Sequence, residues 1–142
     1  MQLRQITDRF AAAPQIAVDD VAELKAAGFS TIVCNRPDGE DPGQPPAAAI
    51  AAAAEAAGLP FRHIPVAGGM ADEAVAAMAA ALGEAPGPVL AYCRTGTRST
   101  LLWALAEASR GRAPDDLAAA AASAGYDVAP VRALMDKRAA TS

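Results

Sequence analysis

The 142-residue chain is poor in residue types that mark several protein classes, with two cysteines, one histidine and 4% aromatic residues. Two cysteines are too few for the disulfide framework of a small secreted protein, and with one histidine they cannot form an ordinary structural zinc site. Positive charge is also scarce, since the formal net charge is −4. A nucleic-acid partner requires a basic surface. We therefore expect no nucleic acid, no metal and no cofactor.

Long apolar segments are missing as well. No run approaches the ~20 residues of a membrane-spanning helix, and Met1–Ile6 lack the apolar centre of a secretory signal. We expect a cytoplasmic protein without a membrane partner, formed by one domain over residues 1–142. Because the cytosol is reducing, we expect no permanent disulfide between Cys34 and Cys93, and we interpret Cys34 as a packing residue.

The hydrophobic residues, 53% of the chain, follow alternating strand and helix patterns. Short apolar runs predict strands at 3–6, 15–17, 29–34, 61–66 and 89–92. Alanine-rich and amphipathic segments predict helices at 20–27, 47–57, 71–82, 101–110, 114–124 and 131–138. This alternation predicts an α/β fold with a mainly parallel sheet flanked by helices. Ligands bind beyond the carboxyl ends of such strands, so we expect the strand ends near Asn35, Val66 and Cys93 to share one crevice.

The most informative segment runs from Cys93 to Thr100 and connects a predicted strand to a predicted helix. A tight loop there directs backbone N–H groups and the positive end of the helix dipole at the Cys93 sulfur, which favours the nucleophilic thiolate. Gly96 permits the sharp turn. Arg98 carries a planar fork of donors suited to an oxyanion. The segment predicts an anion-binding loop with a nucleophile at its base.

Other side chains are assigned to this site by their positions in the sequence. Ser99 is expected to hydrogen-bond the Cys93 sulfur, to cap the following helix, or to do both. Arg36 follows a strand end, so it is either a contact to the anion or a solvated loop charge. The residues expected to bind the substrate anion are Arg94, Thr95, Gly96, Thr97 and Arg36.

Three stretches carry a family resemblance, namely Tyr92–Ser99, Thr31–Glu40 and His63–Val66. They resemble the phosphatase-like domain of beta-lactamase-hydrolase-like proteins, and the likeness covers nearly the whole chain. It implies a fold like that of dual-specificity cysteine phosphatases, with Cys93 as nucleophile and Arg98 as oxyanion clamp. Members of this family are often labelled sulfurtransferases. Relatives are fused to a persulfide dioxygenase, which the resemblance therefore suggests as a partner.

Two features distinguish the reactions that such a site supports. Cysteine phosphatases resemble one another in placing five residues between nucleophile and arginine, whereas only four, Arg94 to Thr97, intervene here, as in the rhodanese loop. Phosphatases of this type also carry a proton-donating aspartate after the strand that corresponds to 61–66. Residues 67–70 contain no acid. Asp72 is the nearest carboxylate, and we expect it to be a helix N-cap, with a catalytic acid as the alternative. A missing general acid costs a factor of about 10² to 10⁴ in rate.

Sulfur transfer needs no such acid, because its leaving group departs as a stable anion. We therefore favour a sulfurtransferase in which Cys93 takes sulfur from thiosulfate or a persulfide, holds it as a persulfide and passes it to an acceptor. The first alternative is a cysteine-dependent phosphatase with weak or specialised activity on a phosphate ester. The second is a non-catalytic regulatory module that binds an anion.

Overall fold

The computed structural model describes residues 1–141 and has a five-stranded sheet at its centre. The strand order is β1-β2-β5-β3-β4, in which β1 is antiparallel to β2 and all other neighbours are parallel. The mainly parallel sheet predicted from the sequence is confirmed. The strands are β1 (Arg4–Thr7), β2 (Phe10–Ala13), β3 (Thr31–Cys34), β4 (Phe61–His63) and β5 (Val89–Tyr92).

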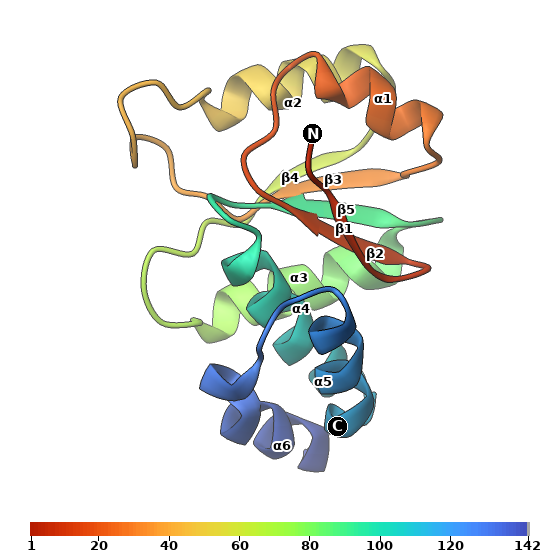
Figure 1. Ribbon diagram of the computed structural model, residues 1–142, viewed down its shortest axis with the longest axis vertical. Coiled ribbons are helices and arrows are strands. Elements are labelled where there is room, and N and C mark those ends of the chain that lie inside the picture. Colours follow the sequence, from red (N-terminus) through yellow and green to blue (C-terminus); the bar gives the residue numbers. More distant parts are fainter. Residues whose placement is uncertain (142) are drawn as a thin grey trace.

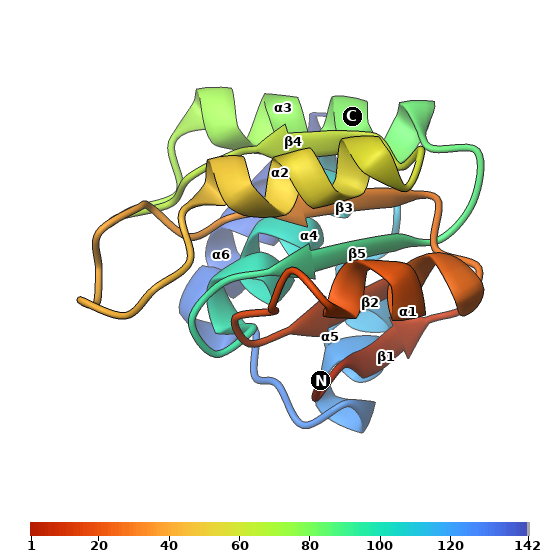
Figure 2. The ribbon, with the colours of Figure 1, turned by 90° about the horizontal axis from the view of Figure 1, so that it is seen from above.

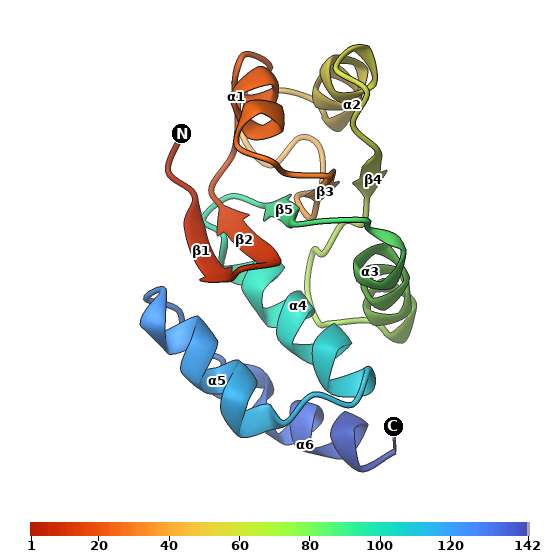
Figure 3. The same cartoon turned by 90° about the vertical axis from the view of Figure 1, so that its right-hand side faces the viewer.

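Helices cover both faces of this sheet, as Figures 1 and 3 show. α1 and α2 lie on one face, α3 and α4 lie on the other, and α5 and α6 pack outside α4. None of the helices within residues 1–141 is both long and apolar enough to cross a membrane. The helices are α1 (Asp20–Ala26), α2 (Ala47–Ala56), α3 (Asp72–Glu84), α4 (Thr97–Ser109), α5 (Pro114–Ser123) and α6 (Arg132–Ala140), with a 3-10 turn at Ala129–Val131.

The N-terminal strands differ from the prediction. Residues 15–17 are not a strand, and the second strand is instead Phe10–Ala13, which lies between β1 and β5. All four of its residues are buried, and three of them are alanine. Alanine is depleted in strands and carries little packing surface, so this run lacks the branched side chains from which a strand is recognised. The strand is buried because it lies between β1 and β5, which its composition alone does not indicate.

Helix α4 is the most deeply buried helix because it lies between the sheet and the α5–α6 pair (Figure 3). Its Trp103 ring stacks on Phe10 of β2 with centroids 5.4 Å apart. Such packing holds the helix rigidly against the sheet. The loop between β5 and α4 begins at Cys93, and it lies at the same edge of the sheet as the loop that follows β3 (Figure 2). The predicted anion-binding loop therefore sits on a fixed support.

Candidate active site

The loop from Cys93 to Gly96 turns sharply from β5 into α4. Gly96 is the N-cap residue and has a φ of 91°, a left-handed conformation that glycine adopts without strain. Its N–H donates to the Cys93 sulfur at 3.1 Å, and the N–H of Cys93 donates to the Ala13 carbonyl at 3.2 Å. The sulfur is thus held at the positive end of α4 by a backbone donor, an arrangement that stabilises negative charge at this point.

Tyr126 supports the loop from behind. Its hydroxyl donates to the Thr95 carbonyl at 3.3 Å. A Cβ added to Gly96 would lie only 2.1 Å from the Tyr126 hydroxyl oxygen, so a larger residue at position 96 would collide with it. The Arg4 guanidinium lies 5.3 Å from the centre of the Tyr126 ring. Burial raises the pKa of Tyr126, so its hydroxyl stays a neutral donor. Sequence analysis missed this residue, because it lies after α5 and nothing in the chain near Tyr126 indicates a contact with the active loop.

Arg98 joins the ends of three strands. Its Nη1 and Nη2 atoms contact the two carboxylate oxygens of Glu40 at 2.7 and 2.8 Å, and Nη1 also donates to the Val66 carbonyl at 2.6 Å. Glu40 follows β3 and Val66 follows β4, while Arg98 itself follows the Cys93 loop. The Glu40 carboxylate raises the pKa of Arg98, and the nearby Cys93 sulfur adds to this effect. These contacts bring the expected strand ends together.

Arg36 lies beneath this arrangement, with a side chain only 4% exposed. Its Nε donates to Glu40 at 2.9 Å, its Nη2 to Asp41 at 2.6 Å and its Nη1 to Gln15 at 3.1 Å. Arg36 is therefore not a solvated loop charge, and its nitrogen atoms are occupied by protein acceptors. It holds Glu40 against Arg98. The sequence analysis assigned no role to Glu40 or Asp41, although two acids that closely follow a strand end could have indicated ion pairs with the arginines of the site.

The remaining predicted residues are spread over the loop and its rim. Arg94 has a 62% exposed side chain and lies 3.5 Å from Asp41, so it is a cation at the mouth of the site. Thr95 donates its hydroxyl to that of Thr97 at 3.1 Å. Ser99 is fully buried, and its hydroxyl has no hydrogen-bond partner within residues 1–141. In this structure it neither bonds the sulfur nor caps α4.

Asp72 lies outside the site. It is the first residue of α3, and the N-cap is Ala71, so the predicted cap is wrong by one position. The Asp72 carboxylate pairs with Arg138 of α6 at 2.6 Å and is almost fully exposed. This ion pair directs it away from the Cys93 loop. The stretch from 67 to 70 therefore contributes no acid, and Asp72 does not replace one.

Cys34 and His63 both contact the backbone carbonyl of Arg36. The Cys34 thiol donates to the Arg36 carbonyl at 3.4 Å, and burial raises the pKa of this thiol. His63 Nε2 contacts the same carbonyl at 3.0 Å. Cys34 and Cys93 are both free thiols. Nowhere in residues 1–141 do three His, Cys, Asp or Glu side chains group closely enough to hold a metal ion.

Because Arg98 and Arg36 both bind Glu40, they hold its pKa at about 2 instead of the ordinary 4.5, with Arg98 making the largest contribution. A depressed carboxylate pKa stabilises the fold above the unfolded-state value, and the contribution is lost as the pH falls from about 4.5 towards 2. We expect Glu40→Gln to lower the free energy of unfolding at pH 7 by about 1–2 kcal/mol. Urea unfolding at several pH values should show this difference shrinking towards zero near pH 2. A difference that is constant with pH would contradict the assignment.

Solved structures resemble this chain over almost its whole length. A candidate phosphatase from Neisseria meningitidis is 35% identical, covers 97% of this chain and 99% of its own, and superposes with a TM-score of 0.81. Tk-PTP in its active form covers 96% of this chain and 95% of its own at 20% identity, with a TM-score of 0.72. The second likeness is one of fold alone. Together they confirm the cysteine-phosphatase-type α/β fold.

Sequence relatives place the chain in a family. The "Beta-lactamase hydrolase-like protein" of Agrobacterium fabrum is 42% identical over 113 residues, which make up 79% of this chain. The match covers 26% of that relative, so this chain corresponds to about a quarter of its length. The family model described as "Beta-lactamase hydrolase-like protein, phosphatase-like domain" matches residues 2–110. The chain therefore belongs to the family of phosphatase-like domains of beta-lactamase hydrolase-like proteins.

Proposed function

We propose that this domain is a cysteine-dependent phosphatase with Cys93 as its nucleophile. The observation that carries the proposal is the Arg98 fork, which stands beside Cys93 and binds two oxygens of one anion, those of Glu40, at 2.7 and 2.8 Å. A guanidinium held in this way is suited to the oxygens of a phosphate. Similarity to the candidate phosphatase from Neisseria meningitidis supports phosphoryl transfer more than sulfur transfer.

The reaction proceeds in two displacements. The Cys93 thiolate attacks phosphorus, so a sulfur–phosphorus bond forms while the bond from phosphorus to the leaving oxygen breaks and that oxygen keeps the electron pair. Water then attacks the phosphocysteine, releases inorganic phosphate and restores the thiolate. The proton lost by this water passes to solvent or to the phosphate product. The Gly96 amide and Arg98 stabilise the charge at each stage.

The ion pairs of the site limit the leaving group. Glu40 stays ionised because its pKa is held at about 2, and the Asp41 carboxylate is paired with Arg36 and Arg94. Glu40 is therefore not a proton donor near neutral pH. We therefore infer that good substrates have leaving oxygens that depart as stable anions, such as aryl and acyl phosphates. TpbA of P. aeruginosa, which shares the fold at a TM-score of 0.57, was solved with phosphotyrosine, an aryl phosphate.

Turnover should depend steeply on the acidity of the leaving group. We expect an alkyl phosphate such as glycerol phosphate to react about 10² to 10⁴ times more slowly than 4-nitrophenyl phosphate, the factor that a general acid otherwise supplies. Steady-state kinetics over a series of aryl and alkyl phosphates measures this slope. Equal rates across the series would indicate a proton donor and would contradict the limit on the leaving group.

Sulfur transfer remains the second candidate, because four residues rather than five separate Cys93 from Arg98. Intact-protein mass spectrometry separates the two reactions. After rapid mixing with 4-nitrophenyl phosphate and quenching in acid, a gain of one phosphoryl group that is absent in Cys93→Ser supports the phosphatase. A gain of one sulfur atom from thiosulfate, with no phosphate release from any ester, would overturn it.

A further inference from the structure

A second pocket lies at the end of the sheet remote from Cys93, and we propose that it binds a phosphate group. It is lined by Phe10 and Val89, the first residues of β2 and β5, and by Trp103 and Glu107 of α4. Strand β5 runs from Val89 towards Cys93, so the two sites lie at opposite ends of the same strand. The pocket volume is about 110 Å³. A bulk water occupies about 30 Å³, so this space accommodates one tetrahedral oxyanion.

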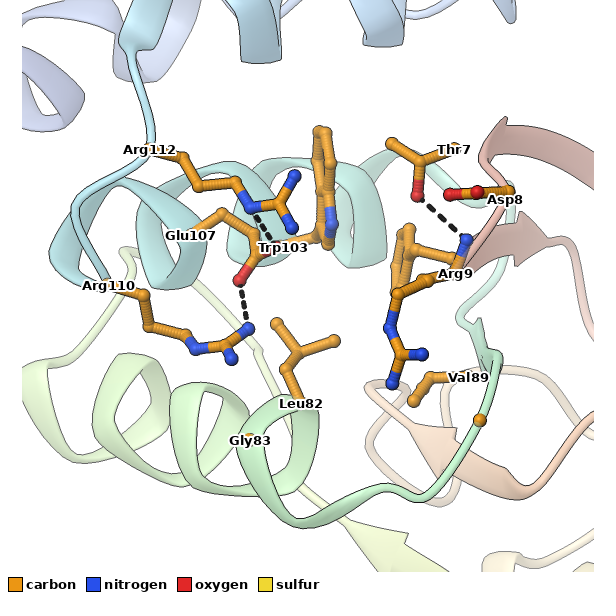
Figure 4. A pocket seen from close by; sticks show the side chains of 12 residues that line it. Thr7, Asp8, Arg9, Leu82, Gly83, Val89, Trp103, Glu107, Arg110 and Arg112 are labelled. Atoms are coloured by element: carbon orange, nitrogen blue, oxygen red, sulfur yellow. Dashed lines mark hydrogen bonds and ion pairs between the residues drawn. The ribbon is translucent and has the colours of Figure 1, made fainter.

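Three guanidinium groups line this pocket (Figure 4). Arg9 comes from the turn between β1 and β2 and donates to the Ala85 carbonyl at 3.3 Å. Across the pocket, Arg110 and Arg112 contact the two carboxylate oxygens of Glu107 at 2.5 and 3.2 Å. A guanidinium has five N–H donors, so these contacts leave most donors of each arginine available to a ligand.

The charges of the pocket do not balance. Against the three arginines stand two carboxylates, the deeply buried Glu107 and the exposed Asp8. Arg9 has no carboxylate partner within residues 1–141. An excess of one positive charge therefore gathers at the rim of the pocket, where all three arginines are exposed, in a chain whose net charge is −4. A bound anion would neutralise the excess and would bridge Arg9 to the Arg110–Glu107–Arg112 cluster.

The indole of Trp103 offers a further donor to this pocket. The residue is 1% exposed as a whole, but its N–H has no acceptor among the described residues and is not one of their fully buried polar atoms, so it opens into the pocket. In Figure 4 its nitrogen is turned towards the space between Arg9 and Glu107. Water in the pocket can reach this N–H, so a ligand has to replace that water contact. An oxygen of a bound anion would do so.

The arrangement of donors favours a phosphate group over other anions. The arginines and the indole offer donors from several directions, whereas the acceptors in the pocket are already engaged or lie at its edge. A phosphate group carries several acceptor oxygens and about two negative charges, which suits such a set. Free phosphate and the phosphate of a monoester share this chemistry, and the experiment below distinguishes them. The proposal does not depend on the reaction at Cys93.

Trp103 is the only tryptophan of the chain, so its fluorescence reports directly on this pocket. We expect inorganic phosphate, titrated at constant ionic strength with sodium chloride as the balancing salt, to change the emission with saturation. A parallel titration uses glycerol phosphate. Tighter binding of glycerol phosphate than of inorganic phosphate identifies a phosphate monoester as the ligand, and weaker or equal binding identifies free phosphate. In Arg9→Gln we expect phosphate affinity to fall about tenfold, because a charge-assisted contact is lost.

Two controls separate this pocket from the active loop. Arg98→Lys should leave the Trp103 response unchanged, since Arg98 lies at the other end of the sheet. Arg9 is exposed in a turn, so Arg9→Gln should fold normally by circular dichroism and keep its 4-nitrophenyl phosphatase rate. The proposal is overturned if the emission does not saturate, if chloride alone reproduces it, or if Arg98→Lys rather than Arg9→Gln abolishes it.

Discussion

We expect Cys93→Ser to fold like the parent protein and to lose turnover of 4-nitrophenyl phosphate by at least about 10⁴-fold, the order of loss that follows removal of a catalytic nucleophile. The substitution is small, and a serine hydroxyl still accepts the Gly96 N–H that contacts the sulfur at 3.1 Å. A hydroxyl is not ionised near neutral pH, however, so the nucleophile is missing. Steady-state kinetics measures the loss, and circular dichroism verifies the fold.

Cys34→Ser is the matched control, because it makes the same chemical change in the other buried free thiol. Serine at 34 can still donate to the Arg36 carbonyl, the contact that the thiol makes at 3.4 Å. We expect its turnover to stay within a few-fold of the parent rate. Equal losses in the two variants would indicate that both act through folding. Retained turnover in Cys93→Ser would exclude a covalent intermediate on Cys93.

Arg98→Lys is expected to lower kcat/KM by about 10²-fold, comparable to the loss of one oxyanion-hole donor. Lysine keeps the positive charge but cannot contact two oxygens of an anion in one plane, as Arg98 contacts those of Glu40 at 2.7 and 2.8 Å. The rate of phosphocysteine formation in a single-turnover experiment should fall in parallel with kcat/KM.

Arg94→Lys provides the comparison at the same loop. The Arg94 side chain is 62% exposed, and among the described residues it pairs only with Asp41, at 3.5 Å, so a lysine there keeps the charge at the mouth of the site. We expect no more than a few-fold change, mainly in KM and with greater sensitivity to salt. A loss as large as that of Arg98→Lys would indicate that the charge at the rim, rather than the half-buried Arg98 fork, governs the reaction.

The fold and the centre of the site could be predicted because local signals and topology agree there. A strand, a glycine turn and a helix place Cys93 and Arg98 without reference to distant residues. The strand-end rule likewise brings Val66 to Arg98, which the 2.6 Å contact confirms. The strand at 15–17 was wrong because the alanines of Phe10–Ala13 carry no β signal.

The surroundings of the loop could not be predicted, since they depend on contacts between distant segments. Glu40 lies 58 positions before Arg98, and Tyr126 lies 31 positions after Thr95. No periodicity or turn motif links such pairs. The four-residue spacing suggested sulfur chemistry for a similar reason. It describes only the length of the loop, whereas Glu40 and Arg36, from outside the loop, fix the orientation of the Arg98 guanidinium.

Tyr126 has a consequence for where this module ends. The family model stops at residue 110, yet the hydroxyl that supports the Gly96 turn is supplied sixteen positions later, and α6 packs along α4. The two C-terminal helices, α5 and α6, are therefore an integral part of the folded domain. A fusion or a truncation designed at residue 110 would uncover a flank of α4 and remove the hydroxyl behind the turn, so any junction with a following domain belongs after α6.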